Sequence, residues 1–145
     1  MKILSQHYPH LVMSGIDICE KALSYARYIN RKAYFIVGNV YSIPMKAHSY
    51  DLVLCTEVLE HLDSPLEALQ EIKRISKRYC LLSVPNEPSF RGLSLLRGNY
   101  IGRLGKHPEH VHTFSSAQFL QLLDGFLIRK VKKPFPWIVV LCEVT

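Results

Sequence analysis

Hydrophobic residues occur in two alternating patterns along the chain: short continuous runs, and positions spaced three or four residues apart. Continuous runs of about four to eight apolar residues indicate buried strands, whereas the wider spacing is typical of amphipathic helices. The spaced pattern predicts a helix from about Glu20, with Ala22, Leu23, Ala26 and Ile29 on one face. Strands are predicted at six segments that are rich in apolar residues: Leu11–Ile18, Ala33–Val37, Tyr50–Cys55, Tyr79–Val84, Leu127–Lys132 and Trp137–Thr145. This alternation predicts an α/β sheet with crossover helices.

Two later helices carry start signals in the sequence. Ser64, Pro65 and Glu67 form a predicted capping box with proline at the first helical position. The apolar residues that follow at helical spacing are Leu66, Leu69, Ile72 and Ile75. A helix is therefore predicted to begin at Pro65.

The second start signal combines Ser115 and Gln118 as a capping box with Phe114 and Phe119 as a hydrophobic staple. The helix it opens is predicted to end near Gly125. The two final strands are separated by a Pro-Phe-Pro turn and are expected to pair antiparallel. Between the fourth strand and this helix, residues 86–109 form a long excursion rich in Gly and Pro, a kind of loop that is usually functional.

Length and composition are consistent with one globular domain over residues 1–145. Hydrophobic residues make up 48% and charged residues 21% of the chain, which is enough apolar material for a core. The longest purely apolar run, Trp137–Leu141, is far shorter than the roughly 20 residues that a membrane-spanning helix needs. No signal-peptide core follows Lys2, so we expect a cytoplasmic protein without a membrane span.

The net charge of +6 is compatible with an anionic partner but is too low for a dedicated nucleic-acid binder. The basic residues gather at 73–78 and 129–133, interleaved with apolar positions, which favours solvated faces of a helix and an edge strand. An RNA-binding role stays open as the weaker interpretation. The four cysteines are far apart and are expected to be buried, reduced thiols: Cys19, Cys55, Cys80 and Cys142.

Asp17 ends the strand that precedes the first long helix. In an open parallel sheet, an acidic residue at such a position commonly accepts hydrogen bonds from ribose hydroxyls, because a carboxylate can accept from two adjacent hydroxyls. The alternative is that Asp17 only caps the following helix, since Glu20 lies three residues on. The residue by itself leaves both interpretations open.

Residues 33–85 contain, in order, GNVYSIPM, SYDLVLCTEVLEHLDSPLEALQEIKRISK and CLLSVPN, and EHVHTFSSAQFLQLL follows later. This succession resembles the class I S-adenosylmethionine-dependent methyltransferases. Their sequences read E-V-L-E-H after the family's fourth strand, which corresponds to Tyr50–Cys55 here. The resemblance extends from about Tyr8 to Thr145. It implies a Rossmann-like class I methyltransferase sheet, mostly parallel with an antiparallel C-terminal strand, and S-adenosyl-L-methionine as the cofactor.

The resemblance also implies roles for single residues along the chain. Asp17 matches the acidic position that binds the cofactor ribose, and Ile18 its apolar neighbour against adenine. Asn39 and Val40 match the pair after the family's third strand, which corresponds to Ala33–Val37 here. The family usually has an Asp at the first of these positions, which accepts from the adenine amino group. An Asn can still accept through its amide oxygen. The turn that lies along the methionine moiety of the cofactor is matched by Thr56, Glu57 and Val58.

On the substrate side, Glu60 and His61 match the last two letters of E-V-L-E-H, and His110 and His112 lie on the loop that precedes the last helix. His61 is a weak candidate for a catalytic base, because many methyl transfers need only alignment of the nucleophile with the methyl group. We interpret it rather as a packing and hydrogen-bonding residue. The histidines near residue 110 are expected to close over a pocket, and no metal site is predicted.

One part of the family pattern has no match in the sequence. The glycine-rich loop D/E-x-G-x-G-x-G and the strand before it are absent, and Lys2–His10 resembles the end of the helix that normally follows them. The family places that strand at the centre of the sheet, between the strands that end at Asp17 and Cys55. Three explanations stay open: the two flanking strands pair directly, another chain or copy fills the gap, or the sequence is N-terminally truncated.

The resemblance therefore predicts a methyltransferase that acts on an unidentified acceptor, most simply a small molecule. A catalytically inactive methyltransferase-like subunit or fragment that binds a protein partner or RNA is the alternative.

Overall fold

The computed structural model describes residues 2–86 and 111–144 of the chain. They fall into two compact units, Met1–Pro44 and Met45–Thr145, and each unit is described by itself. The expectation of one domain over residues 1–145 stays a prediction.

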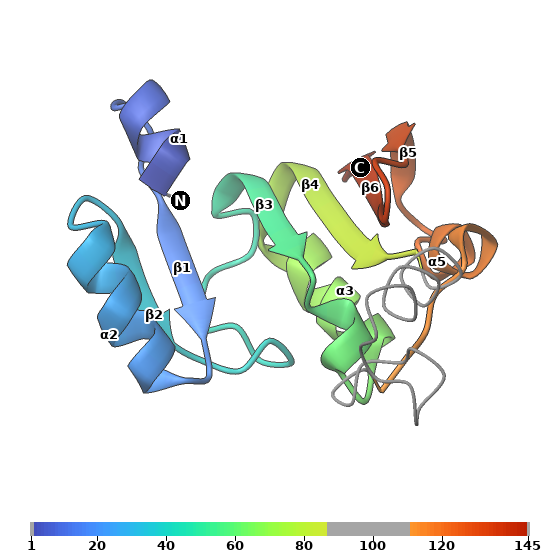
Figure 1. Cartoon of the computed structure of the whole chain (residues 1–145), viewed down its shortest axis with the longest axis horizontal. Coiled ribbons are helices and arrows are strands. Elements are labelled where there is room, and N and C mark those ends of the chain that lie inside the picture. Colours follow the sequence, from blue (N-terminus) through green and yellow to red (C-terminus); the bar gives the residue numbers. More distant parts are fainter. Residues whose placement is uncertain (1, 87–110, 145) are drawn as a thin grey trace. The chain divides into compact units, whose positions relative to one another are not determined.

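The first unit is a short parallel sheet with two helices. Strands β1 and β2 run parallel, with Ser14 opposite Tyr34 and Asp17 opposite Val37. Helix α2 connects them and lies along the pair (Figure 1). The elements are α1 (Lys2–His7), β1 (Ser14–Asp17), α2 (Glu20–Ile29) and β2 (Tyr34–Val37).

This unit buries few of its apolar side chains. On the predicted face of α2, Leu23 is buried and Ala26 half-buried, whereas Ala22 and Ile29 are exposed. Strand β1 is shorter than the predicted Leu11–Ile18, because the residues on both sides of Ser14–Asp17 lie outside the ladder with β2. A two-stranded sheet has only marginal stability unless it packs against further elements.

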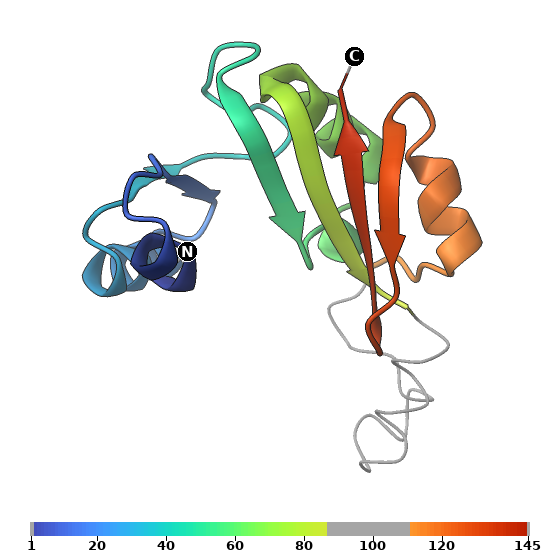
Figure 2. The ribbon, with the colours of Figure 1, turned by 90° about the horizontal axis from the view of Figure 1, so that it is seen from above.

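The second unit is a four-stranded sheet with helices on one face. The strand order is β3-β4-β6-β5; β3 and β4 are parallel, and β6 is antiparallel to both β4 and β5 (Figure 2). Its elements are β3 (Tyr50–Thr56), the 3-10 helix η1 (Leu59–His61), α3 (Pro65–Ile75), β4 (Ser76–Pro85), α5 (Ser116–Leu122), β5 (Leu127–Lys132) and β6 (Trp137–Glu143). The predicted antiparallel C-terminal pair is confirmed.

The core of this unit lies between the sheet and its helices, which Figure 2 shows with α3 behind β4. Alternate residues of β4 and β6 face it, as the two-residue period of a strand requires. From β4 and β6 the buried residues are Cys80, Leu82, Val84, Ile138, Val140 and Cys142; from the helices they are Ala68, Leu69, Ile72, Ile75 and Phe119. All six of these strand residues have 0% exposure, so the β4–β6 pair is the centre of the core.

Of the two predicted capping boxes, only the second forms. The Ser115 hydroxyl accepts from the Gln118 N–H at 3.3 Å, and the Gln118 side chain accepts from the Ser115 N–H at 3.0 Å. Helix α3 does begin at Pro65, but the Ser64 side chain makes no capping hydrogen bond, so that part of the prediction is wrong. The physical reason is the backbone: ψ is 75° at Ser64 and 164° at Ser115, where the residue is extended.

The cysteines correct one further expectation. The expectation for the basic residues at 129–133 is confirmed, because all four are exposed, on or next to the edge strand β5. All four cysteines are free, and three are buried, but Cys19 is exposed because it is the N-cap of α2 at the edge of the first unit. Arg74 donates to Glu71 and to the Met45 carbonyl, and Arg129 pairs with Glu143, so several residues of the basic clusters serve internal contacts. None of the helices among the described residues is long and apolar enough to cross a membrane.

Within the described residues, four strands are hydrogen-bonded on one side only: β1 and β2, which pair with each other, and the edge strands β3 and β5. Within the described residues, β1 pairs with β2 alone and β3 with β4 alone. The three explanations for the absent central strand stay hypotheses. Each of these strands keeps a row of backbone donors and acceptors along its other edge.

The capping box of α5 makes a stability prediction. Ser115→Ala removes the side-chain acceptor for the Gln118 N–H and should lower the free energy of unfolding by about 1 kcal/mol. Ser116→Ala, one residue into the same helix, is the control and should change stability by less than about 0.5 kcal/mol. Urea denaturation of both variants measures the difference, and equal effects would contradict the capping role.

Candidate functional site

The carboxyl ends of β1 and β2 bring the first group of predicted residues together. The Gly38 N–H donates to the Asp17 carbonyl at 3.0 Å, so the chain segments after the two strands lie side by side. Gly38 fits a crowded position: a Cβ atom there would lie 2.5 Å from Ile16 Cδ1 and 3.2 Å from Pro44 Cδ, so the Ile16 side chain would have to shift. Ligands of open parallel sheets bind at this end of the strands.

Asp17 and Asn39 each accept one hydrogen bond from a backbone N–H two residues further along the chain. Asp17 Oδ1 accepts from the Cys19 N–H at 2.8 Å, and Asn39 Oδ1 accepts from the Tyr41 N–H at 3.0 Å. The interpretation of Asp17 as a helix cap is thus partly right. Its carboxylate orders the turn before α2, but the N-cap residue of the helix is Cys19. A carboxylate has about four acceptor sites, so Asp17 can still bind a diol.

The apolar neighbours differ in exposure. Ile18 is 75% exposed, which gives this edge an uncovered apolar surface next to Asp17, whereas Val40 is half-buried. An exposed isoleucine beside a carboxylate is suited to a ligand with one flat apolar part and one hydroxylated part.

In the second unit, the turn after β3 contains the predicted residues Thr56, Glu57 and Val58. Thr56 ends the strand and is exposed, and Val58 is half-buried. Glu57 has φ of +55°, in the left-handed region that costs a non-glycine residue about 1–2 kcal/mol. Its backbone is held there because its N–H donates to the Ser83 carbonyl at 3.1 Å.

The Glu57 carboxylate is fixed by two residues that sequence reasoning missed. Ser83 Oγ donates to Oε1 and Trp137 Nε1 donates to Oε2, both at 2.8 Å. Ser83 lies on β4 and is 6% exposed, and Trp137 begins β6. The sequence contained one signal, since Trp137 is its only tryptophan and follows a Pro-Phe-Pro turn, but the pairing depends on the sheet order.

Helix η1 places Glu60 and His61 next to the segment before α5. Glu60 is 2% exposed, and His61 Nε2 lies 3.8 Å from its Oε1. The His112 N–H donates to the Glu60 carbonyl at 3.0 Å, and His112 Nε2 lies 3.3 Å from the Asp63 carbonyl. The structure thus brings His112 next to the turn that carries Glu60 and His61, while His110 lies outside the described residues.

Cys55 lies one residue before the turn at Thr56 and is buried. Burial raises the pKa of the Cys55 thiol to about 12, and the nearby Glu60 and Cys80 act in the same direction. Cys55 is therefore an uncharged packing residue at neutral pH and not a nucleophile. Leu59, which follows the turn, is fully buried as expected of a core position.

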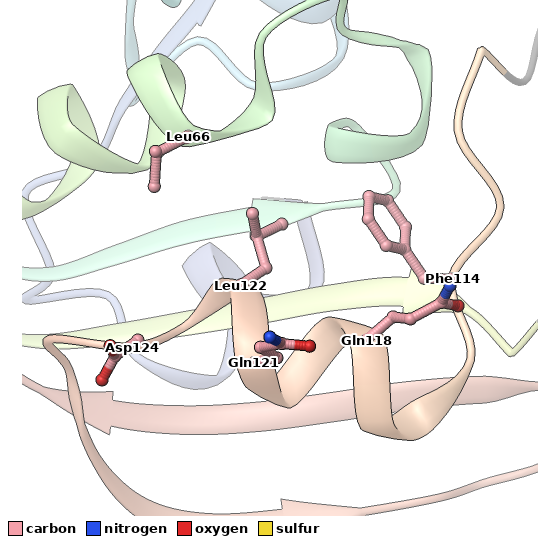
Figure 3. A pocket seen from close by; sticks show the side chains of 6 residues that line it. All are labelled: Leu66, Phe114, Gln118, Gln121, Leu122 and Asp124. Atoms are coloured by element: carbon pink, nitrogen blue, oxygen red, sulfur yellow. The ribbon is translucent and has the colours of Figure 1, made fainter.

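A separate groove lies between α3 and α5, as Figure 3 shows. Its volume is about 490 Å³, and its lining residues are Leu66, Phe114, Gln118, Gln121, Leu122 and Asp124. None of the predicted site residues lines it. Within the described residues, no group of three or more His, Cys, Asp or Glu side chains is arranged to hold a metal ion.

Comparison with known proteins identifies the family of the chain. Residues 1–83 match the family model described as a methyltransferase domain. The chain belongs to the class I S-adenosylmethionine-dependent methyltransferases. The matched region contains the residues of both groups described above, except His112 and Trp137, which lie beyond residue 83.

Curated relatives are matched over only part of their own length. The chain is 27% identical over 96 residues to the demethylmenaquinone methyltransferase of Thermotoga maritima, which is 63% of this chain and 42% of that protein. It is 40% identical over 43 residues to an uncharacterized methyltransferase of Schizosaccharomyces pombe, 30% of this chain and 16% of the relative. The chain therefore spans less than half the length of these relatives.

Among solved structures, a methyltransferase of Thermotoga maritima described as a possible histamine N-methyltransferase has a TM-score of 0.73 at 19% identity, covering 94% of this chain and 75% of that one. Magnesium protoporphyrin IX methyltransferase from Synechocystis, solved with bound S-adenosylhomocysteine, has a TM-score of 0.70 at 20% identity. The match covers 99% of this chain and 68% of that one. These confirm the predicted Rossmann-like α/β fold. The family resemblance and the family's cofactor, S-adenosyl-L-methionine, are confirmed as well.

The strained turn at Glu57 makes a second stability prediction. Glu57→Ala and Glu57→Gly both remove the carboxylate, but only the alanine keeps a Cβ atom at φ +55°. The glycine variant should therefore be the more stable of the two by about 1 kcal/mol, opposite to the order expected at an ordinary strand position. Chemical denaturation of the pair measures this, and a more stable alanine variant would refute the strain.

Proposed function

We propose that this protein transfers the methyl group of S-adenosyl-L-methionine to a small-molecule acceptor. The observation that carries the proposal is the family match over residues 1–83 together with an acidic residue, Asp17, at the carboxyl end of the first strand beside Asn39. The inactive-subunit alternative has no specific observation in its favour.

In the first unit, Asp17 is proposed to accept from the ribose hydroxyls through the acceptor sites that the Cys19 N–H leaves open. Ile18 would pack against the adenine ring, since its side chain is exposed next to this carboxylate. Asn39 would accept from the adenine amino group through Oδ1, which already accepts from the Tyr41 N–H and has a second lone pair, with Val40 beside it.

In the second unit, the backbone of Thr56, Glu57 and Val58 is proposed to lie along the methionine moiety. The turn is suited to this because Glu57 is fixed on both its backbone and its side chain. A preorganised turn loses little conformational entropy when a ligand binds. His61, His110 and His112 are proposed to face the acceptor.

The bound cofactor supplies an electrophilic methyl group on a sulfonium sulfur. The nucleophilic atom of the acceptor forms the new bond to carbon as the carbon–sulfur bond breaks, and the acceptor loses its proton to solvent or to a nearby base. Alignment of the acceptor is the main task of the protein in such a reaction. His61 is exposed and close to Glu60, a position suited to orienting the acceptor.

Partners and location are proposals of the same kind. The free edge of β3 supports pairing with a further strand, from another copy or another segment of polypeptide. RNA binding is less favoured, because residues of both basic clusters are engaged in internal pairs. The cytoplasmic location stays a prediction.

Asp17 provides the direct test of the cofactor site. Asp17→Asn keeps an acceptor for the Cys19 N–H but removes the charge that would bind the ribose diol. The affinity for S-adenosylhomocysteine, measured by calorimetric titration, should fall by about 10- to 100-fold, the usual worth of a hydrogen bond to a charged group.

The matched control is Glu20→Gln, which removes an acidic charge three residues away that pairs with Arg27. It should leave the affinity within about twofold. Equal losses in the two variants would show a general charge effect, and absence of any binding by the unmodified chain would refute the proposed function.

Asn39 makes a prediction with the opposite sign. Asn39→Asp introduces the acidic acceptor that the family usually has at this position and should raise the affinity for S-adenosylhomocysteine by about 2- to 10-fold. The same titration should show no gain for S-inosylhomocysteine, whose base carries no amino group. A gain of equal size for both ligands would contradict the assignment to adenine.

A further inference from the structure

Trp137 lies at the same end of the sheet as the proposed transfer site, and its side chain is exposed there. It begins β6 opposite Pro85, the last residue of β4, and is 42% exposed. Phe135, two residues before it, is 65% exposed. Two large aromatic side chains are thus uncovered at one end of the sheet, whereas Ile138, the next residue of β6, is fully buried.

The indole of Trp137 is fixed in spite of its exposure. Its only polar side-chain atom, Nε1, donates to Glu57 Oε2 at 2.8 Å, and the other oxygen of this carboxylate accepts from Ser83. Residues at the ends of three strands, β3, β4 and β6, therefore contribute to one hydrogen-bonded chain. Because the N–H is engaged, the surface that the side chain offers to a ligand is the apolar face of the ring.

The arrangement has a cost in the folded protein. Glu57 has its backbone in the left-handed region, and the residue is half-buried. Strained residues of this kind persist where the surrounding structure holds them, and they cluster at ligand sites. Packing does not require the arrangement, because a side chain that is 42% exposed is not a core residue.

We infer that the ring face of Trp137 is a stacking surface for a flat, conjugated ring in the methyl acceptor, with Glu57 as the positioning residue that holds the indole. This inference rests on the proposed function and names the class of its acceptor. Aromatic rings prefer offset-stacked or edge-to-face contacts, so a fixed ring selects planar ligands over saturated ones of the same size.

The only tryptophan of the chain gives a direct readout, because its indole N–H produces a single cross-peak in a ¹H–¹⁵N spectrum. The protein, saturated with S-adenosylhomocysteine, is titrated with 2-naphthol and separately with its saturated analogue, decahydro-2-naphthol. We expect a saturable shift of the indole signal and an affinity for 2-naphthol about 2- to 10-fold higher than for the saturated alcohol.

Three variants separate the roles. Trp137→Leu should abolish the preference for the planar ligand. Glu57→Gln, which keeps the size of the side chain and removes its charge, should move the indole signal of the free protein and weaken 2-naphthol binding. Tyr25→Leu, which removes an exposed aromatic ring on α2, is the matched control and should change neither.

Equal affinity for the two alcohols, or no saturable shift with either, would overturn the inference even if the cofactor binds. Unchanged 2-naphthol binding in Glu57→Gln would also overturn it, since the carboxylate would then not position the indole. Calorimetry with S-adenosylhomocysteine alone reports on the proposed function separately. If Trp137→Leu fails to fold, the selectivity of the unmodified protein and the Glu57→Gln result still decide.

Discussion

The larger unit depends on the two ladders of β4, which is parallel to β3 on one side and antiparallel to β6 on the other. This central strand supplies the buried residues Cys80, Leu82 and Val84 to the core and places Ser83 on the opposite side of the pleat. Because β3 and β4 are parallel, their carboxyl ends meet at one edge. Because β6 is antiparallel, its first residue, Trp137, comes to that same edge. The chain of hydrogen bonds from Ser83 through Glu57 to Trp137 follows from this topology.

In the smaller unit, no described strand is paired on both sides as β4 is, and most apolar side chains of its helix α2 are exposed. Among the apolar residues of α2 only Leu23 is well buried, and Tyr34 and Val37 of β2 remain exposed. A parallel strand is normally buried and paired on both sides. Within the described residues of this unit, β1 and β2 pair only with each other. The carboxyl end of β1 is nevertheless ordered by local hydrogen bonds at Asp17 and Asn39.

Polar groups at the two sheet edges are positioned by different means. Asp17 and Asn39 each accept from a backbone N–H two residues further on, so short-range geometry alone orients them. Glu57 accepts from side chains that lie 26 and 80 residues away along the chain. The first kind of site survives small changes in tertiary structure. The second depends on the register of three strands, and a shift of one residue in that register would reverse the side chains involved.

The sequence by itself determined the order of strands and helices, the family, and the start of two helices, because hydrophobic period and capping residues are local properties. It predicted the box at Ser115 correctly and the box at Ser64 wrongly, since a capping bond also requires a backbone angle that neighbouring elements impose. It indicated Glu57 as a site residue through the E-V-L-E-H motif. Only the tertiary structure decided that Ser83 and Trp137 hold its carboxylate, because contacts across three strands follow from the sheet order and register, which no local pattern contains.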